Sequence, residues 1–480
     1  MINKDFSVKE MMIVIKRIEH ELSGWKYYES INGKSPVAAM FFVFLKYIDD
    51  KCPLQCDDLS EATIFKEMKR ILSHQERISN SLIYRYIKMQ LETWNDDGSI
   101  LMQYVQRIDF EKLPEEFLNI INILDEYTFK TNDTKENLIY AILTLYSSLY
   151  GNQFLKNSLN NSDLDIIISA AELLQCNDGM EIYDFSCGTG SLLAISSTTD
   201  CTIYGQERDF EKAVIAYMLL RITGVDTIHI EVGDVLQNPM TSNYPGKLYD
   251  RIISAPPCEY KEISSEKLNS SKFGEEFLYG DSLSESGFWI YARHIVRKLK
   301  DDGKGVLIAP VSLLSREGVT KEDRVRLAKD GSIEAIIQLP SGITSTAVKL
   351  CMIILRKGPG HEDAEIQLID LKESHIERGN SNRTLDHKKV AEIVNNKECI
   401  EGICTFVSLY DMEERGMNFT PALYLRTINE YMAQKENTID ILEKQKELLG
   451  QYRISEEELE KAILNYYQLW NNKDRTKEDI

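Results

Sequence analysis

The sequence predicts an α/β protein in which a doubly wound parallel sheet lies between two helical regions. Three observations predict the sheet. Residues 181–185 form a short apolar stretch that runs directly into a glycine turn at Gly188 and Gly190, and an apolar helical pattern follows. The apolar stretches 202–206 and 227–232 come next, and each is followed at once by an acidic residue or by Gly-Asp. Strands that are buried on both faces of a parallel sheet have such continuous apolar runs.

The region before the sheet, residues 1–165, is predicted to be an all-helical N-terminal domain. Ser7 and Glu10 have the spacing of a capping box. Ser35 and Pro36 place an N-cap and a first-turn proline ahead of a long apolar stretch. These signals mark the starts of two helices, and no alternating pattern typical of strands interrupts them.

Residues 166–425 are predicted to alternate strands and helices as one domain. The expected strands are 181–185, 202–206, 227–232, 248–254, 305–310, 332–338 and 350–356, the last completing the sheet, and the expected helices are 189–197, 209–223 and 284–300. Residues 426–480 are predicted to be a helical C-terminal segment, with an apolar stripe that includes Leu459 and Ile463. That stripe either packs back on its own domain or docks on a partner helix, and the two alternatives stay open.

The ends of the first three strands supply a set of candidate ligand groups. Gly188 and Gly190 would let a ligand approach the backbone, although a third glycine is missing because Leu193 takes its place. Glu207 lies about twenty residues after the turn, where a carboxylate can accept both hydroxyls of a ribose. Asp234, after the third strand, suits a contact with an adenine ring. The alternative is that these are ordinary turn acids, but their joint spacing favours a nucleoside site.

The residues from Asp184 to Gly190 resemble the S-adenosylmethionine loop of N6-adenine DNA methyltransferases, and more narrowly of the methylation subunits of type I restriction-modification systems. Gly205-Gln206-Glu207 is similar to the second motif of that subfamily, and residues 303–357 follow its later strands. The resemblance implies a Rossmann-like S-adenosylmethionine-dependent methyltransferase core. It also implies that S-adenosyl-L-methionine is the cofactor and that DNA is reached through a specificity subunit, with a restriction subunit or a second methylation subunit as further partners. The cofactor-binding residues that it implies are Asp184, Ser186, Gly188, Gly190, Glu207 and Asp234.

The catalytic tetrapeptide of this family, Asn/Asp-Pro-Pro-aromatic, has an altered counterpart here. Directly after the strand 248–254 the chain has Ala255-Pro256-Pro257-Cys258. Alanine cannot accept a hydrogen bond from an adenine amino group, and cysteine offers little surface for stacking on a flipped base. The segment 151–163 also lacks the Thr-Pro turn that helps to close the cofactor site in this family, which predicts weakened cofactor binding. Methyl transfer by this chain alone is therefore expected to be slow or absent.

Three functions are compatible with these residues. The chain could work as a methylation subunit in a DNA-modifying complex, serve as a non-catalytic scaffold that binds cofactor or partners, or methylate another substrate. We favour a chain that descends from methylation subunits and now acts as a non-catalytic scaffold. Methylation of another substrate is the least favoured, since no new acid or base lies near Ala255 in the sequence.

Composition adds constraints on partners and location. The formal net charge of −20 opposes approach to DNA phosphates, so a partner subunit is expected to supply the DNA affinity. The nine cysteines are scattered, which favours reduced buried thiols, and we expect no metal site. No apolar run is long enough to cross a bilayer, and a cytoplasmic protein is expected.

Overall fold

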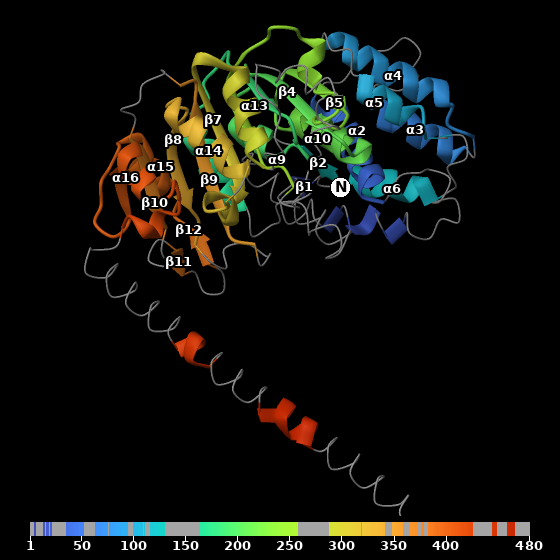
Figure 1. Ribbon diagram of the computed structural model, residues 1–480. Helices are drawn as coiled ribbons and strands as arrows, with labels where there is room; N and C mark the ends of the chain where they lie inside the picture. Colours follow the sequence, from blue (N-terminus) through green and yellow to red (C-terminus); the bar gives the residue numbers. More distant parts are fainter. Residues whose placement is uncertain are drawn as a thin grey trace, which may run out of the picture. The chain divides into compact units, whose positions relative to one another are not determined.

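The computed structural model consists of two units, residues 1–421 and residues 422–480 (Figure 1). Apart from a few isolated positions, the residues it describes are 4–5, 13–21, 35–51, 63–94, 99–110, 116–129, 164–257, 288–340, 348–358, 365–371, 376–378, 383–425, 444–448 and 458–465.

A nine-stranded sheet forms the centre of the first unit, in the order β13-β10-β8-β9-β7-β6-β3-β4-β5. In chain order its strands are β3 (Glu181–Asp184), β4 (Thr202–Glu207), β5 (Thr227–Val232), β6 (Tyr249–Ser254), β7 (Leu299–Pro310), β8 (Ile333–Gln338), β9 (Leu350–Arg356), β10 (Ile366–Asp370) and β13 (Cys404–Val407). Neighbouring strands are parallel except where β9 and β13 join the sheet. A mostly parallel sheet has to be covered on both faces, so the helices around it are part of the same core.

Helices cover both faces of the sheet. They are α8 (Leu164–Leu174), α9 (Ser191–Ser196), α10 (Phe210–Ile222), α13 (Trp289–Lys298), α14 (Val319–Lys329) and α15 (His387–Asn395). Successive residues of a strand point to opposite faces. In β3, Ile182 joins the apolar core that α8, α9 and α10 share, whereas the Tyr183 hydroxyl lies 3.3 Å from His294 Nε2 on α13. The doubly wound α/β prediction for this region is therefore confirmed.

The strand order places a topological switch point between β3 and β6. The chain runs from β3 through β4 to the edge strand β5, and then returns to the other side of β3 as β6. Connections leave β3 and β6 in opposite directions, so their carboxyl ends are not covered by one common loop. Ligands of open α/β sheets bind at such a switch point.

The N-terminal part of the first unit contains helices but is not all helical. Its helices are α2 (Ser35–Lys51), α3 (Ile64–Ser73), α4 (Asn80–Thr93), α5 (Ser99–Val105) and α6 (Glu116–Asp125). The strand β1 (Lys4–Asp5) pairs in parallel with β2 (Tyr127–Thr128), which corrects the all-helical expectation. Two residues per strand are too few to show an alternating pattern, and the pairing joins segments far apart in the sequence.

Two cation–π contacts join the N-terminal helices to α10. The Arg221 guanidinium carbon lies 4.7 Å from the centre of the Trp94 ring, and that of Arg107 lies 3.6 Å from the Phe210 ring. Arg221 is almost fully buried and also donates hydrogen bonds to the carbonyls of Val225 and Asp226, at 3.3 and 2.6 Å. Arg221 thus links Trp94 to the turn that follows α10.

Several predicted boundaries change. In the described part of the chain α13 begins at Trp289 and ends at Lys298, because Leu299 already starts β7. The strand at 350–356 does not complete the sheet, since β10 and β13 extend it beyond β8. Two further helical segments, 444–448 and 458–465, lie in the second unit. The capping box at Ser7 and the segment 151–163 fall outside the described residues.

No helix in the described ranges is long and apolar enough to cross a membrane.

Candidate functional site

The glycine turn after β3 takes the conformation that its two glycines allow. Gly188 and Gly190 have φ of 57° and 82°, in the left-handed region that side chains disfavour. Gly190 is the N-cap of α9, and a Cβ there would lie only 3.0 Å from the Cα of Ala216 on α10. A Cβ on Gly188 would meet no atom within 4 Å. Gly190 is therefore needed for packing, whereas Gly188 faces open space.

Glu207, the last residue of β4, holds this turn through both oxygens of its carboxylate. Oε2 accepts a hydrogen bond from the Gly188 N–H at 3.0 Å, and Oε1 accepts one from the Asp209 N–H at 2.8 Å. The Glu207 carbonyl in turn accepts from the Gly233 N–H at 2.9 Å, which fixes the start of the loop after β5. The sequence predicted a carboxylate at this place, but it did not predict that backbone donors would orient it.

Asp184, at the end of β3, is fully buried and receives two hydrogen bonds on one oxygen. The Ser254 hydroxyl donates to Oδ1 at 2.6 Å, and the Ser186 N–H donates to the same oxygen at 2.9 Å. Burial raises the pKa of Asp184 to about 7, the two hydrogen bonds oppose the rise, and the charge of Glu207 adds to it. Within the described part of the chain, Asp184 Oδ2 is buried with no hydrogen-bond partner.

Asp234 uses its carboxylate to close its own turn. Oδ1 accepts from the Leu236 N–H at 3.0 Å, and Oδ2 accepts from the Gln237 side-chain amide at 3.3 Å. Its neighbour Gly233 is bound to Glu207, so Asp234 lies at the same edge of the sheet as the glycine turn.

The altered tetrapeptide begins where β6 ends. Ala255 is half-buried, Pro256 is buried and Pro257 is exposed, and all three directly follow Ser254. Since Ser254 binds Asp184, the structure brings Ala255 and the cofactor-binding candidates to one place. Cys258 lies outside the described residues.

The sequence reasoning missed two side chains at this edge. Ser254 was treated only as the end of a strand, and no sequence signal could show its contact with a residue 70 positions away. Tyr291 on α13 stacks on Phe185, with ring centres 5.4 Å apart and planes 12° apart. Burial raises the pKa of Tyr291, and the charge of Asp234 adds to this effect. The sequence signal that could have indicated this stacking is that residues 185 and 291 are both aromatic.

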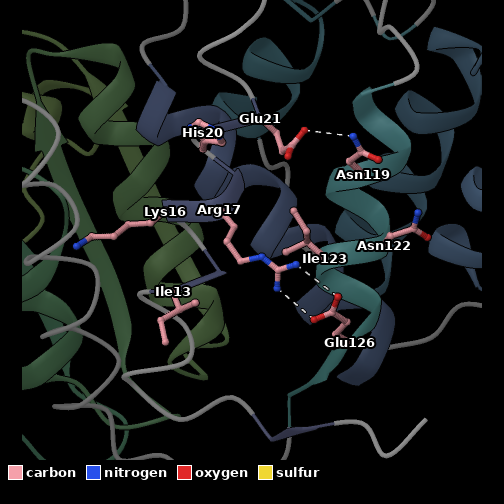
Figure 2. Close-up of a pocket in the computed structure, with 9 residues that line it drawn as sticks. All are labelled: Ile13, Lys16, Arg17, His20, Glu21, Asn119, Asn122, Ile123 and Glu126. Atoms are coloured by element: carbon pink, nitrogen blue, oxygen red, sulfur yellow. Dashed lines mark hydrogen bonds and ion pairs between the residues drawn. The ribbon is translucent and has the colours of Figure 1, made fainter.

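A hollow in the N-terminal region is a second candidate site. Its lining residues are Ile13, Lys16, Arg17, His20, Glu21, Asn119, Asn122, Ile123 and Glu126. Figure 2 shows Arg17 directed at Glu126 and Glu21 directed at Asn119, which are joined at 3.1 and 3.2 Å. The hollow contains none of the predicted cofactor or tetrapeptide residues, and four of its polar lining residues are already paired with one another. The strand ends remain the better candidate.

Comparison with known proteins decides the family. The family described as N-6 DNA Methylase matches residues 164–432. This chain belongs to that family. The type I restriction enzyme MjaVIII methylase subunit of Methanocaldococcus jannaschii is 21% identical over 440 residues, which cover 82% of this chain and 75% of that protein. The MjaVII methylase subunit of the same organism is 26% identical over 317 residues, or 60% of this chain and 54% of that protein.

Solved structures of type I systems share the fold. The methyltransferase subunit of a type I restriction-modification system from Streptococcus thermophilus has a TM-score of 0.60 at 17% identity, over 87% of this chain and 99% of that one. A chain solved in work on complex assembly and conformational transition of the type I system has a TM-score of 0.55 at 16% identity, over 91% of this chain and 97% of that one. At such identities the similarity concerns the fold.

Membership in this family implies S-adenosylmethionine as the cofactor, and the residues at the strand ends fit it. The open space beside Gly188 can take a ligand against the backbone. Glu207 is an oriented carboxylate that suits a ribose diol, and the unpaired buried oxygen of Asp184 suits a cationic amino group. These two acceptors thus match the ribose hydroxyls and the amino group of the cofactor.

Proposed function

We propose that this chain binds S-adenosylmethionine at the carboxyl ends of β3, β4 and β5. In this proposal Glu207 holds the ribose, Gly188 lets the cofactor approach the backbone, and Gly190 keeps the turn packed on α10. Ser186 and Asp184 receive the amino acid end, and Asp234 lies at the adenine end. When bound, the cofactor supplies an electrophilic methyl group.

We further propose that the chain is an N6-adenine DNA methyltransferase by descent whose methyl transfer is impaired, a pseudoenzyme or nearly so. The observation that carries this proposal is Ala255, which occupies the first tetrapeptide position directly after Ser254. An asparagine or aspartate there would accept a hydrogen bond from the adenine amino group and so direct the nitrogen lone pair at the methyl group. Loss of one preorganised hydrogen bond of this kind costs about 3–4 kcal/mol of barrier, by analogy with oxyanion holes.

An impaired chain can still serve a DNA-modifying complex. A net charge of −20 repels DNA phosphates, so in our proposal DNA is reached through a specificity subunit. A restriction subunit or a second methylation subunit completes the complex. The alternative function is a scaffold that binds cofactor or partner and transfers no methyl group. We keep the division into residues 1–165, 166–425 and 426–480 as the working domain organisation of this subunit.

The test combines binding with transfer. Isothermal calorimetry of S-adenosylmethionine is expected to show binding by the wild type, and no heat at millimolar ligand would contradict the cofactor proposal. Radiolabelled methyl transfer to DNA, in the presence of the specificity subunit, is expected to be weak with the wild type. The double change Ala255→Asn, Cys258→Phe is expected to raise it, because asparagine returns the acceptor and phenylalanine returns a stacking face. Robust transfer by the wild type would refute the impairment.

A further inference from the structure

One hydrogen bond joins the cofactor turn to the tetrapeptide. The Ser254 hydroxyl at the end of β6 donates to Asp184 Oδ1 at the end of β3, at 2.6 Å, and both side chains are fully buried. β3 and β6 are neighbouring parallel strands at the switch point of the sheet. The bond therefore joins the two strands at the switch point, next to which ligands of such sheets bind.

The two oxygens of Asp184 have different surroundings. Oδ1 accepts from the Ser254 hydroxyl and from the Ser186 N–H, whereas Oδ2 is buried and has no partner within the described residues. Two donors on Oδ1 favour the ionised carboxylate and fix its plane. Oδ2 is then the atom that either carries a proton or accepts from a ligand.

We propose that Ser254 is a positioning residue, which favours the ionised form of Asp184 and orients its carboxylate so that Oδ2 receives the cationic amino group of the cofactor. Asp184 and Ser254 together form a proton switch, since the protonated carboxyl group cannot pair with a cation. This inference rests on the cofactor site proposed above, and it adds the element that regulates that site.

The groups around Asp184 decide whether its protonated or its ionised form is favoured. Glu207 on β4 faces Asp184 and disfavours its ionised form, as does burial. The Cys187 thiol in the turn also faces Asp184, and burial raises the pKa of that thiol, so it stays neutral. In the described part of the structure, Ser254 and Ser186 are the groups that oppose these effects. Removal of Ser254 therefore raises the pH at which Asp184 ionises.

The size of the effect follows from the pKa of Asp184, which is about 7. A hydrogen bond to a charged group corresponds to about one to two pH units. If the midpoint of the Asp184 titration moves from about pH 7 to about pH 8, the ionised fraction of Asp184 at pH 7 falls about fivefold. At pH 9 that fraction is almost unchanged. A purely structural defect would weaken binding by the same factor at both values.

The experiment measures the dissociation constant of S-adenosylmethionine at pH 6–9 for the wild type and for Ser254→Ala. Titration of the ligand itself affects both proteins equally, so it cancels in the ratio of the two constants. We expect a ratio of about five at pH 7 that approaches one at pH 9. Ser254→Thr keeps the hydroxyl and is expected to follow the wild-type profile. Ser196→Ala is the matched control, because it also removes one buried serine hydroxyl, but from α9 and not from β6.

The non-titrating variant Asp184→Asn gives a second measurement that does not depend on the serine. It is expected to bind more weakly and to lose the part of the pH dependence centred near pH 7. The proton switch would be overturned if the ratio of the Ser254→Ala dissociation constant to the wild-type one stayed constant with pH. The cofactor site would then remain in place. Unchanged pH dependence in Asp184→Asn would have the same consequence. No binding by the wild type at any pH would overturn the site, and the switch with it.

Discussion

Gly188 and Gly179 offer a matched pair for testing whether the glycine turn binds a ligand. Both glycines have left-handed backbone, with φ of 57° and 79°, and a Cβ on either would meet no atom within 4 Å. Alanine at either position should therefore cost only the backbone strain of a left-handed residue, about 1–2 kcal/mol. Gly179 lies in the turn before β3, whereas Gly188 lies in the turn after it, where the N–H is bound to Glu207.

The two changes should differ in their effect on the cofactor. We expect Gly188→Ala to weaken S-adenosylmethionine binding by about tenfold or more, because a methyl group would occupy space that the ligand needs and a tenfold loss is only about 1.4 kcal/mol. Gly179→Ala should bind as the wild type does. Gly190→Ala should be the least stable variant, since its methyl group would also press on Ala216, and overpacking adds about 1–3 kcal/mol to the strain.

Two measurements decide the matter. Urea denaturation gives the free energy of unfolding of the three variants, and calorimetry gives their affinity for S-adenosylmethionine. Wild-type affinity in Gly188→Ala would show that the cofactor does not approach this backbone, and the site would have to lie elsewhere. Equal stability of Gly190→Ala and Gly179→Ala would refute the packing argument.

Three further predictions concern charged side chains. Glu207→Gln should weaken S-adenosylmethionine binding about tenfold to hundredfold in calorimetry, because an amide cannot accept from both backbone donors that the carboxylate now binds; unchanged affinity would remove Glu207 from the site. Asp184→Asn should raise the melting temperature at pH 8 but not at pH 4. The pKa of Asp184 is about 7 in the folded protein and about 4 unfolded, so wild-type stability falls as pH rises through this window, by at most about 4 kcal/mol; equal shifts at both pH values would contradict this assignment. Arg221→Ala should lower the free energy of unfolding by about 3–5 kcal/mol in urea titrations, because the carbonyls of Val225 and Asp226 lose their charged donor and Trp94 loses its cation. A loss below about 1 kcal/mol would show that these contacts do not stabilise the fold.

Much of the sheet could be predicted from the sequence because its strands are short apolar runs bounded by turns. The strands at 202–206, 227–232 and 350–356 match β4, β5 and β9 closely. The start of β7 was missed, since Asp301 and Asp302 are exposed and give no apolar signal. The edge strand β13 and its neighbour β10 were missed as well, because each is only a few residues long and is held by pairing with a distant segment.

The sequence by itself determined the local chemistry of the site. Gly188 and Gly190 belong to one turn, and Asp184, Glu207 and Asp234 lie at or just after the ends of three strands, so their spacing along the chain reveals them. Ala255 after the strand was equally visible, because a strand end fixes the register of the residue that follows.

Only the tertiary structure decided which of these groups act on one another. Ser254 reaches Asp184 across 70 residues because β6 returns to the side of β3, and pairing order cannot be deduced from the strands one at a time. Burial by that packing, and not the identity of the residue, raises the pKa of Asp184. Glu207 became an oriented acceptor for the same reason, since the donors that hold it belong to a turn set in place by the neighbouring strand.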